Sequence, residues 1–287
     1  MGVIGLGNMG SALASNLVRA GHGVVAHDVA GPERCPDGVE FATEAAECGR
    51  RASIVVLSLP DGAASLGVAR SLAEAAADPA AVAVRHVVDT STIGPAAAEE
   101  AAALLRTAGI GYVDAPVSGG VAGARARTLF AMVAGSESDC AAVEPVLRAL
   151  SDRRSRVGAR PGMAQALKLA NNFLSATALA ATSEAIAFGR SAGLDMATMI
   201  EVLDASSGRS AATSDKFPNH VLTGRYAAGF SNELMAKDVR LYLSAVEALG
   251  GPAIVGRITA ELWERFAASE PGADFTRIYP FIGGRRD

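Results

Sequence analysis

The chain opens with MGVIGLGNMGSALASNLVRAGHGVVAHD, residues 1–28. A short apolar start leads into the glycine spacing Gly5-x-Gly7-x-x-Gly10, which is followed by an Ala- and Leu-rich stretch with helical periodicity. A second apolar run then ends at Asp28. This order of strand, glycine turn, helix, strand and acid predicts the first βαβ unit of a doubly wound, Rossmann-type sheet that binds a dinucleotide.

Each glycine of this turn has a structural reason. The first glycine allows a tight turn, the second lets the backbone approach a pyrophosphate, and the third lets the helix pack closely on the strand. The N-terminus of the helix then offers N–H groups and a positive partial charge to the phosphates. We therefore expect cofactor contacts from the whole turn: Gly5, Leu6, Gly7, Asn8, Met9 and Gly10.

Asp28 favours NAD over NADP as the cofactor. A carboxylate at the end of the second strand would bind both ribose hydroxyls and repel a 2′-phosphate. Val29 and Ala30 supply no cation for such a phosphate, but Arg34 lies close enough in the sequence to keep NADP open. Almost no residues precede the first strand, so it is either very short or the chain naturally begins upstream of Met1.

Two later segments, 52–64 and 85–105, each carry an apolar run followed by small polar residues and a helical pattern. Such runs are typical of buried parallel strands. Leu59, Pro60 and Thr92 then lie at the carboxyl ends of strands, where ligands bind in these sheets. Capping of the following helix explains Thr92 equally well, and the two roles are compatible.

The segment 111–124, GYVDAPVSGGVAGA, predicts a strand and then a loop that contains Ser118, Gly119 and Gly120. The backbone N–H groups of consecutive small residues can surround an anion such as a substrate carboxylate. A Gly-Gly loop also serves as a simple turn, so this motif alone leaves both interpretations open.

Strand patterns stop after residue 158 and helical periodicity takes over. Alternating strands and helices followed by helices alone predict two domains. We expect an α/β Rossmann-type domain over 1–159 and an all-α substrate and dimerisation domain over 160–287, with a loop after Pro271. The second begins with a long helix over 161–193 that joins the two domains and carries Lys168 and Asn172 on one face.

The composition narrows the classes of partner. A formal net charge of −4 over 287 residues argues against a nucleic-acid or anionic-membrane surface. Polar residues interrupt 161–193 too often for a membrane span. No signal peptide is visible, and the three cysteines show no metal-binding spacing. We expect a cytoplasmic protein with reduced thiols and no metal site.

Four motifs in this order resemble the β-hydroxyacid dehydrogenase family, which includes 3-hydroxyisobutyrate dehydrogenases and tartronate semialdehyde reductases. The likeness covers essentially the whole chain. The motifs are GLGNMG at 5–10, DAPVSGG at 114–120, GMAQALKLANN at 162–172 and KD at 237–238, with DTSTIGP at 89–95 as a weaker fifth.

The resemblance implies a role for each matching residue. Lys168 corresponds to the family's catalytic lysine. Residues that correspond to substrate contacts are Ser118, Gly119, Gly120, Asn172 and Phe230. Residues that correspond to cofactor contacts, besides the glycine turn and Asp28, are Leu59, Pro60 and Thr92, which match contacts near the nicotinamide, and Lys237 and Asp238. Without the resemblance, Lys237 and Asp238 would be interpreted as an ordinary solvated pair on a helix.

The resemblance also implies an NAD(P)-dependent oxidation of a short 3-hydroxy acid, such as 3-hydroxyisobutyrate, to its semialdehyde, or the reverse reduction. As hydride leaves the carbinol carbon, the hydroxyl proton needs an acceptor. A lysine in an apolar cleft beside a positive nicotinamide ring is expected to have a depressed pKa, so Lys168 suits this role. The four histidines lie in no matching segment, which disfavours a His-Asp scheme.

Several alternatives remain at this point. The 6-phosphogluconate dehydrogenases share the SGG loop and the lysine, but Ala170 and the short second half speak against that substrate. Imine or semialdehyde reductases of the same fold, and a non-catalytic dinucleotide-binding scaffold, are the others. The Ala-rich face of 161–193 suggests packing against a second subunit, as in a homodimer or homotetramer.

Overall fold

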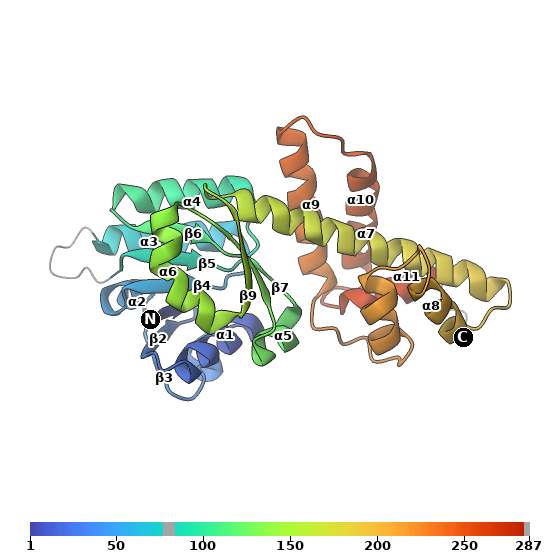
Figure 1. Cartoon of the computed structure of the whole chain (residues 1–287), viewed down its shortest axis with the longest axis horizontal. Coiled ribbons are helices and arrows are strands. Elements are labelled where there is room, and N and C mark those ends of the chain that lie inside the picture. Colours follow the sequence, from blue (N-terminus) through green and yellow to red (C-terminus); the bar gives the residue numbers. More distant parts are fainter. Residues whose placement is uncertain (77–83, 284–287) are drawn as a thin grey trace. The chain divides into compact units, whose positions relative to one another are not determined.

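A nine-stranded sheet forms the centre of the first part of the computed structural model, which describes residues 1–76 and 84–283 (Figure 1). The strand order is β3-β2-β1-β4-β5-β6-β8-β7, with β9 paired to β8. The strands are β1 (Gly2–Ile4), β2 (Val24–His27), β3 (Val39–Phe41), β4 (Ile54–Leu57), β5 (His86–Asp89), β6 (Gly111–Asp114), β7 (Val117–Ser118), β8 (Phe130–Ala134) and β9 (Arg153–Gly158).

Strands β1 to β6 are parallel, whereas β8 runs antiparallel to β6 and β7. The order β3-β2-β1-β4-β5-β6 reverses direction between β1 and β4, so the sheet has the topological switch point at which α/β sheets bind ligands. β1 is only three residues long, yet it pairs with strands on both sides. The Rossmann-type sheet predicted from the sequence is therefore confirmed.

Helices cover both faces of the sheet because successive strand residues point to opposite sides. Val3 packs into the core beneath α1, α5 and α6, whereas its neighbour Ile4 packs into the core beneath α2, α3 and α4 (Figure 1). The helices are α1 (Asn8–Arg19), α2 (Ala45–Arg51), α3 (Gly62–Ala76), α4 (Pro95–Thr107), α5 (Gly120–Ala126) and α6 (Glu137–Leu150).

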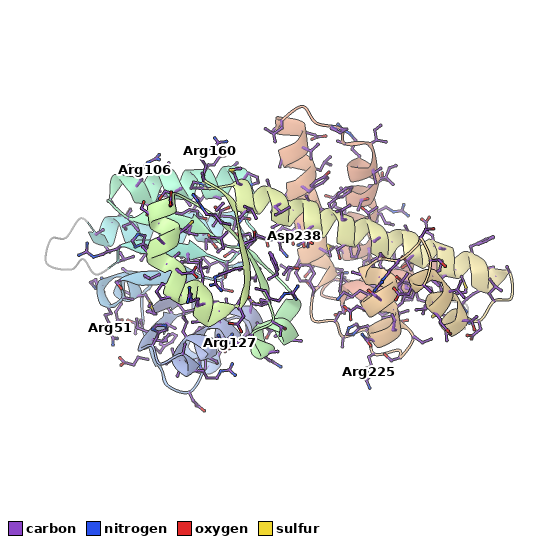
Figure 2. The ribbon with its side chains drawn as sticks, in the orientation of Figure 1. Arg51, Arg106, Arg127, Arg160, Arg225 and Asp238 are labelled. Atoms are coloured by element: carbon purple, nitrogen blue, oxygen red, sulfur yellow. The ribbon has the colours of Figure 1, made fainter. Side chains whose placement is uncertain are left out.

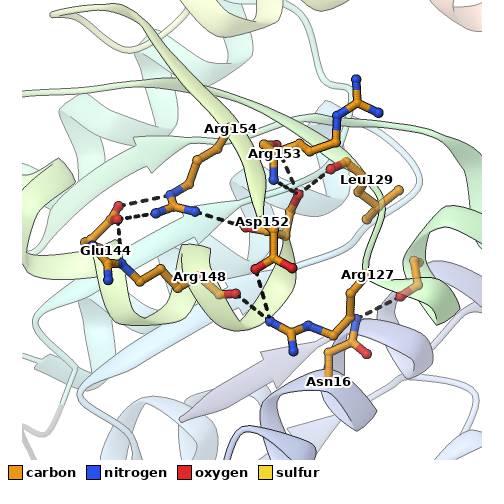
Figure 3. A network of polar contacts seen from close by, with 10 residues as sticks. Asn16, Arg127, Leu129, Glu144, Arg148, Asp152, Arg153 and Arg154 are labelled. Carbon is orange, nitrogen blue, oxygen red and sulfur yellow. Dashed lines mark hydrogen bonds and ion pairs between the residues drawn. The ribbon is translucent and has the colours of Figure 1, made fainter.

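Strand β9 was not predicted, because its sequence RRSRVG alternates no apolar residues. Polar contacts hold the first residues of β9 and the residues just before it (Figure 3). Arg154 donates to Glu144 of α6, which also accepts from Arg148 at 2.9 Å. Arg127 pairs with Asp152 at 3.5 Å. Because β9 pairs only with β8 in the described part of the sheet, its arginines also discourage pairing with another chain.

The chain divides into two compact units, Met1–Lys168 and Leu169–Asp287. The division falls inside α7 (Met163–Ser191), a continuous helix close to the predicted 161–193. The first unit extends past residue 159 because the start of α7 is hydrogen-bonded to Asp114 and to the loop after β5. Gly193 has φ +87°, the left-handed backbone that commonly follows a helix end.

The second unit is helical. Its elements are α8 (Met196–Asp204), a π-helical segment (Ala212–Val221), α9 (Asn232–Ala248), α10 (Ile254–Ser269), a 3₁₀ turn (Phe275–Arg277) and α11 (Ile278–Gly283). Its core surrounds Trp263 and Phe266. The tail after residue 271, expected to be a loop, is helical because Asp274 caps the 3₁₀ turn and Phe275 and Ile278 are buried in that core. In the described residues, no helix combines the length and hydropathy needed to cross a bilayer.

Candidate active site

The glycine turn after β1 shows why its residues are glycines. Gly5 has φ +93°, and a Cβ there would clash with the carbonyl oxygen of Ser58. A Cβ on Gly10 would clash with the carbonyl oxygen of Gly5. A Cβ on Gly7, by contrast, would meet no atom of the described residues within 4 Å. The turn is thus closely packed at both ends and open in front of α1, where a pyrophosphate fits.

Asp28 follows β2 and faces the glycine turn. Its Oδ2 accepts a hydrogen bond of 2.5 Å from the backbone N–H of Leu6, and its Oδ1 accepts one of 2.8 Å from Ala30. The carboxylate is therefore held beside the turn and keeps lone pairs for further donors. Arg34 is exposed on the 3₁₀ turn Pro32–Arg34, a few residues after Asp28. The backbone carbonyl of Arg34 accepts a hydrogen bond of 3.0 Å from the Ser11 hydroxyl of α1.

The loops after β4 and β5 are tied to one another. The backbone N–H of Leu59 donates to Ser91 Oγ at 2.8 Å, and Thr90 Oγ1 donates to the carbonyl of Leu57 at 2.6 Å. Thr92 follows in the same loop and is half-buried, whereas Pro60 is exposed. The three residues expected near the nicotinamide therefore lie on two hydrogen-bonded loops at the carboxyl edge of the sheet.

Ser118, Gly119 and Gly120 form the turn at which β7 ends and α5 begins. Gly119 and Gly120 have φ values of +127° and +65°, which favour glycine at both positions. Both glycines are exposed and Ser118 is half-buried. A Cβ on Gly119 would lie 3.2 Å from the Leu129 side chain, whereas one on Gly120 would meet no described atom within 4 Å. The turn is accessible, as the binding of a small carboxylate requires.

The start of α7 is anchored by two side chains that the sequence analysis did not single out. Asp114 Oδ2 accepts from the backbone N–H groups of Gly162, Ala164 and Gln165 at 3.1 to 3.2 Å. Gln165 Oε1 accepts from the backbone of Ile93 at 3.0 Å, among other contacts of this side chain. Both residues stand inside the matched motifs, and Gln165 is one turn before Lys168, which is the signal that could have identified it.

Two fully buried carboxyl groups lie side by side beneath this anchor. Asp89 and Asp114 are register partners on β5 and β6. Burial and, to a smaller extent, the neighbouring Asp89 raise the pKa of Asp114 to about 7, against the opposing backbone hydrogen bonds from Gln165 and Gly162. Burial also raises the pKa of Asp89, although Ser91 and Tyr112 donate to it. Asp114 therefore changes its protonation near neutral pH.

Lys168 and Asn172 lie four residues apart on α7, and both are nearly buried, with 8% and 7% of their surface exposed. Lys168 is the last residue of the first unit. A lysine amine in such a position can take up or release a proton when a reacting group lies beside it. Among the matched residues, Lys168 is therefore our candidate for proton transfer.

In the second unit, Asp238 of α9 connects two of the matched residues; Figure 2 labels it. Its Oδ2 accepts a hydrogen bond of 2.6 Å from Asn172 Nδ2, and its Oδ1 lies 3.2 Å from Lys237 Nζ. Asn172 Oδ1 also accepts from Asn171 at 3.1 Å. Because Asp238 is 2% exposed, the solvated pair considered from the sequence is not what the structure shows. Asp238 instead orients the Asn172 amide.

Phe230 lies immediately before α9 and is half-buried. Its ring packs edge-on against Phe275 at 5.8 Å, and its carbonyl accepts from the Phe275 backbone at 2.8 Å. The position is therefore held by the core of the second unit. In the described part of the chain, no group of three or more His, Cys, Asp or Glu side chains is placed to hold a metal ion.

Comparisons with known proteins agree with the motifs. Residues 1–158 match the family model described as the NAD binding domain of 6-phosphogluconate dehydrogenase. Residues 162–282 match the one described as NAD-binding of NADP-dependent 3-hydroxyisobutyrate dehydrogenase. A probable 3-hydroxyisobutyrate dehydrogenase of Mycobacterium tuberculosis is 35% identical and is matched over 98% of its length by 99% of this chain. The 3-hydroxyisobutyrate dehydrogenase of Pseudomonas aeruginosa is 34% identical over 98% of both chains.

Solved structures show the same similarity. The structure of Mycobacterium tuberculosis 3-hydroxyisobutyrate dehydrogenase with L-serine has a TM-score of 0.89 at 33% identity and covers 98% of both chains. An imine reductase of Streptomyces aurantiacus shares the fold, with a TM-score of 0.66 at 19% identity over 98% of both chains. The chain belongs to the β-hydroxyacid dehydrogenase family, which consists of NAD(P)-dependent oxidoreductases that act on CH–OH groups.

Proposed function

We propose that the protein oxidises a short 3-hydroxy acid of the 3-hydroxyisobutyrate type to its semialdehyde, and reduces the semialdehyde in the reverse direction, with NAD as the preferred cofactor. The observation that carries the proposal is the nearly buried Lys168 on α7. It stands in a chain whose relatives at 34–35% identity are named 3-hydroxyisobutyrate dehydrogenases. One relative's structure holds L-serine, which is also a short acid with a hydroxyl group at C3.

Each residue has a chemical task in this proposal. The bound nicotinamide supplies the hydride acceptor. Lys168 Nζ, as the neutral amine, takes the hydroxyl proton, and its ammonium returns that proton in the reverse reaction. The Ser118 hydroxyl and the backbone N–H groups of Gly119 and Gly120 bind the substrate carboxylate. Asn172, oriented by Asp238, contacts the reacting oxygen, while Phe230 contributes an apolar wall.

A panel of short hydroxy acids and semialdehydes, assayed by reduced-nicotinamide absorbance with NAD and with NADP, tests this activity. It should include 3-hydroxyisobutyrate, tartronate, 4-hydroxybutyrate and serine, because each presents a carboxylate and a hydroxyl. Turnover of at least one 3-hydroxy acid is expected. Complete inactivity combined with retained NAD binding would favour the non-catalytic scaffold instead, and turnover of imines alone would favour the imine reductase alternative.

The cofactor preference gives a separate prediction. Because the Asp28 carboxylate is held beside the glycine turn, it should repel a 2′-phosphate, so kcat/KM should be higher with NAD than with NADP. Substitution of Asp28→Ala should lower the ratio of kcat/KM with NAD to kcat/KM with NADP. Any loosening of the turn affects both cofactors alike and therefore cancels in this ratio. A preference for NADP in the unsubstituted protein would show that Arg34 holds the phosphate and that Asp28 has another role.

We also propose that the protein forms a homodimer or homotetramer through α7. Leu174, Ala181 and Phe188 recur every seven residues on this helix and are all exposed, with 65% of Leu174 and 77% of Phe188 accessible. An apolar stripe at this spacing is typical of helices that pack against another helix. Light scattering at micromolar concentration should therefore give a multiple of the 29.1 kDa chain mass. A monomeric mass would contradict the proposal, and Phe188→Glu should shift the mass toward the monomer.

A further inference from the structure

We infer that Gln165 is a positioning residue that sets the place of Lys168 relative to the loops expected to contact the nicotinamide, an inference that rests on the proposed function. Every contact that carries it lies within the first unit, Met1–Lys168. Gln165 is fully buried on the first turns of α7. It precedes Lys168 by three residues, a rise of about 4.5 Å along the helix, and shares its face.

The amide oxygen and the amide nitrogen of Gln165 both form hydrogen bonds to the loop after β5. Oε1 accepts from the backbone N–H groups of Ile93 and Gly94 at 3.0 and 3.2 Å, and Nε2 donates to the carbonyl of Ser91 at 3.0 Å. These three residues surround Thr92 in the sequence. The loop that carries Thr92 is therefore bonded to the helix that carries Lys168 by one amide group.

The connection continues to the neighbouring loop. Ser91 Oγ accepts from the backbone N–H of Leu59 at 2.8 Å, so the loop after β4 joins the same assembly. Asp114 also holds the helix start, through the backbone N–H groups of Gly162, Ala164 and Gln165. Displacement of a reacting group by about 1 Å can cost roughly 100-fold in rate, so an anchor one turn away from Lys168 bears directly on its chemistry.

An amide is the side chain that fits this position. A glutamate would still accept from Ile93 and Gly94, but it could not donate to the Ser91 carbonyl when ionised. A methionine of similar length would leave two buried N–H groups and one buried carbonyl without their partner. Substitutions of Gln165→Glu and Gln165→Met therefore remove one and all three of these hydrogen bonds, respectively, while nearly preserving the volume.

The first measurement needs no cofactor. Hydrogen exchange of the cofactor-free protein should show the amides of Ile93 and Gly94 protected in the unsubstituted protein and about tenfold or more faster in Gln165→Met. Ser183→Ala is the matched control, because Ser183 is also fully buried on α7 and donates to the carbonyl of Leu179 at 2.8 Å, within the helix itself. That control should leave exchange at both amides unchanged.

The second measurement is kinetic. Both Gln165 variants should lower kcat roughly 10- to 100-fold, leave KM for NAD within about twofold, and raise the primary deuterium isotope effect on kcat for substrate labelled at the carbinol carbon. A merely structural role would reduce the fraction of active enzyme without moving the isotope effect. Equal isotope effects in the variants, the Ser183→Ala control and the unsubstituted protein would overturn the inference. Absence of turnover in the unsubstituted protein would instead overturn the proposed function.

Discussion

Substitution of Lys168→Ala should lower kcat by roughly 10³-fold or more while leaving the dissociation constant of NAD nearly unchanged. The loss follows because Lys168 is the residue of the matched segment 162–172 with a basic nitrogen that can take the hydroxyl proton. NAD affinity should persist because the glycine turn and Asp28 are expected to bind the pyrophosphate and the ribose, and Asp28 is hydrogen-bonded to the turn itself rather than to α7. Steady-state assays and calorimetric titration with NAD measure the two quantities.

Two further lysine variants sharpen this result. Lys168→Arg keeps the positive charge but cannot lose its proton near neutral pH, so it should be nearly as inactive as the alanine variant. Lys216→Ala removes a lysine of the second unit that is paired with Asp215 and should keep turnover near that of the unsubstituted protein. Normal turnover by Lys168→Arg would mean that Lys168 contributes charge rather than proton transfer.

The stability of the first unit should fall as the pH rises through neutrality, and Asp114→Asn should remove most of that fall. Burial raises the pKa of Asp114 from 3.8 to about 7, so the native state holds this proton more tightly than the unfolded chain. The stabilisation is complete below the unfolded pKa and is lost as the pH passes the folded pKa. A pKa shift of about three units corresponds to about 4 kcal/mol in the free energy of unfolding. About 2 to 3 kcal/mol of this is lost between pH 5 and pH 8.

The asparagine variant tests this group apart from its neighbours. It keeps an oxygen for the three α7 N–H groups, but it adds a buried amide donor where Asp114 Oδ1 has no hydrogen-bond partner among the described residues. That donor should cost about 1 to 3 kcal/mol at every pH. The variant should therefore be less stable at pH 5 and approach or exceed the unsubstituted protein at pH 8. Asp89 and Tyr112 are present in both proteins, so their titration largely cancels.

Urea unfolding followed by two signals measures this difference. Circular dichroism reports on both units, whereas Trp263, the chain's one tryptophan, is buried in the core of the second unit and reports its unfolding by fluorescence. The pH dependence should appear in the dichroism transition and not in the fluorescence transition. Identical pH slopes for Asp114→Asn and the unsubstituted protein would show that Asp114 does not hold the proton.

Much of the fold could be predicted because its local patterns agree with the final packing. The Gly5–Gly10 turn, the buried runs of β4 and β5 and the proline-free helix after Pro161 each have one favoured structure. β9 could not be predicted, because its sequence is mostly polar and its place is decided by backbone pairing with β8 and by the contact of Arg154 with Glu144. The helical tail after Pro271 was missed for a similar reason, since burial of Phe275 and Ile278 in a non-local core decides it.

The candidate site also depends on contacts between residues that are far apart in the chain. The motifs predict Lys168, Asn172 and the Ser118 turn as site residues, because each motif is a run of neighbouring residues that can be recognised in the sequence. The connections among them join residues far apart in the chain: Gln165 to Ser91 spans 74 positions, and Asn172 to Asp238 spans 66. Such contacts leave no periodic pattern, so burial and hydrogen bonding had to come from the structure.

The most direct measurement is the formation of NADH in a single turnover, with enzyme in excess over a 3-hydroxy acid that the substrate panel selects. The unsubstituted protein should form NADH in proportion to the acid added, and Lys168→Ala, saturated with NAD at the same concentration, should form it roughly 10³-fold more slowly or not measurably. Equal rates of NADH formation by the two proteins would contradict the assignment of Lys168 as the acid/base.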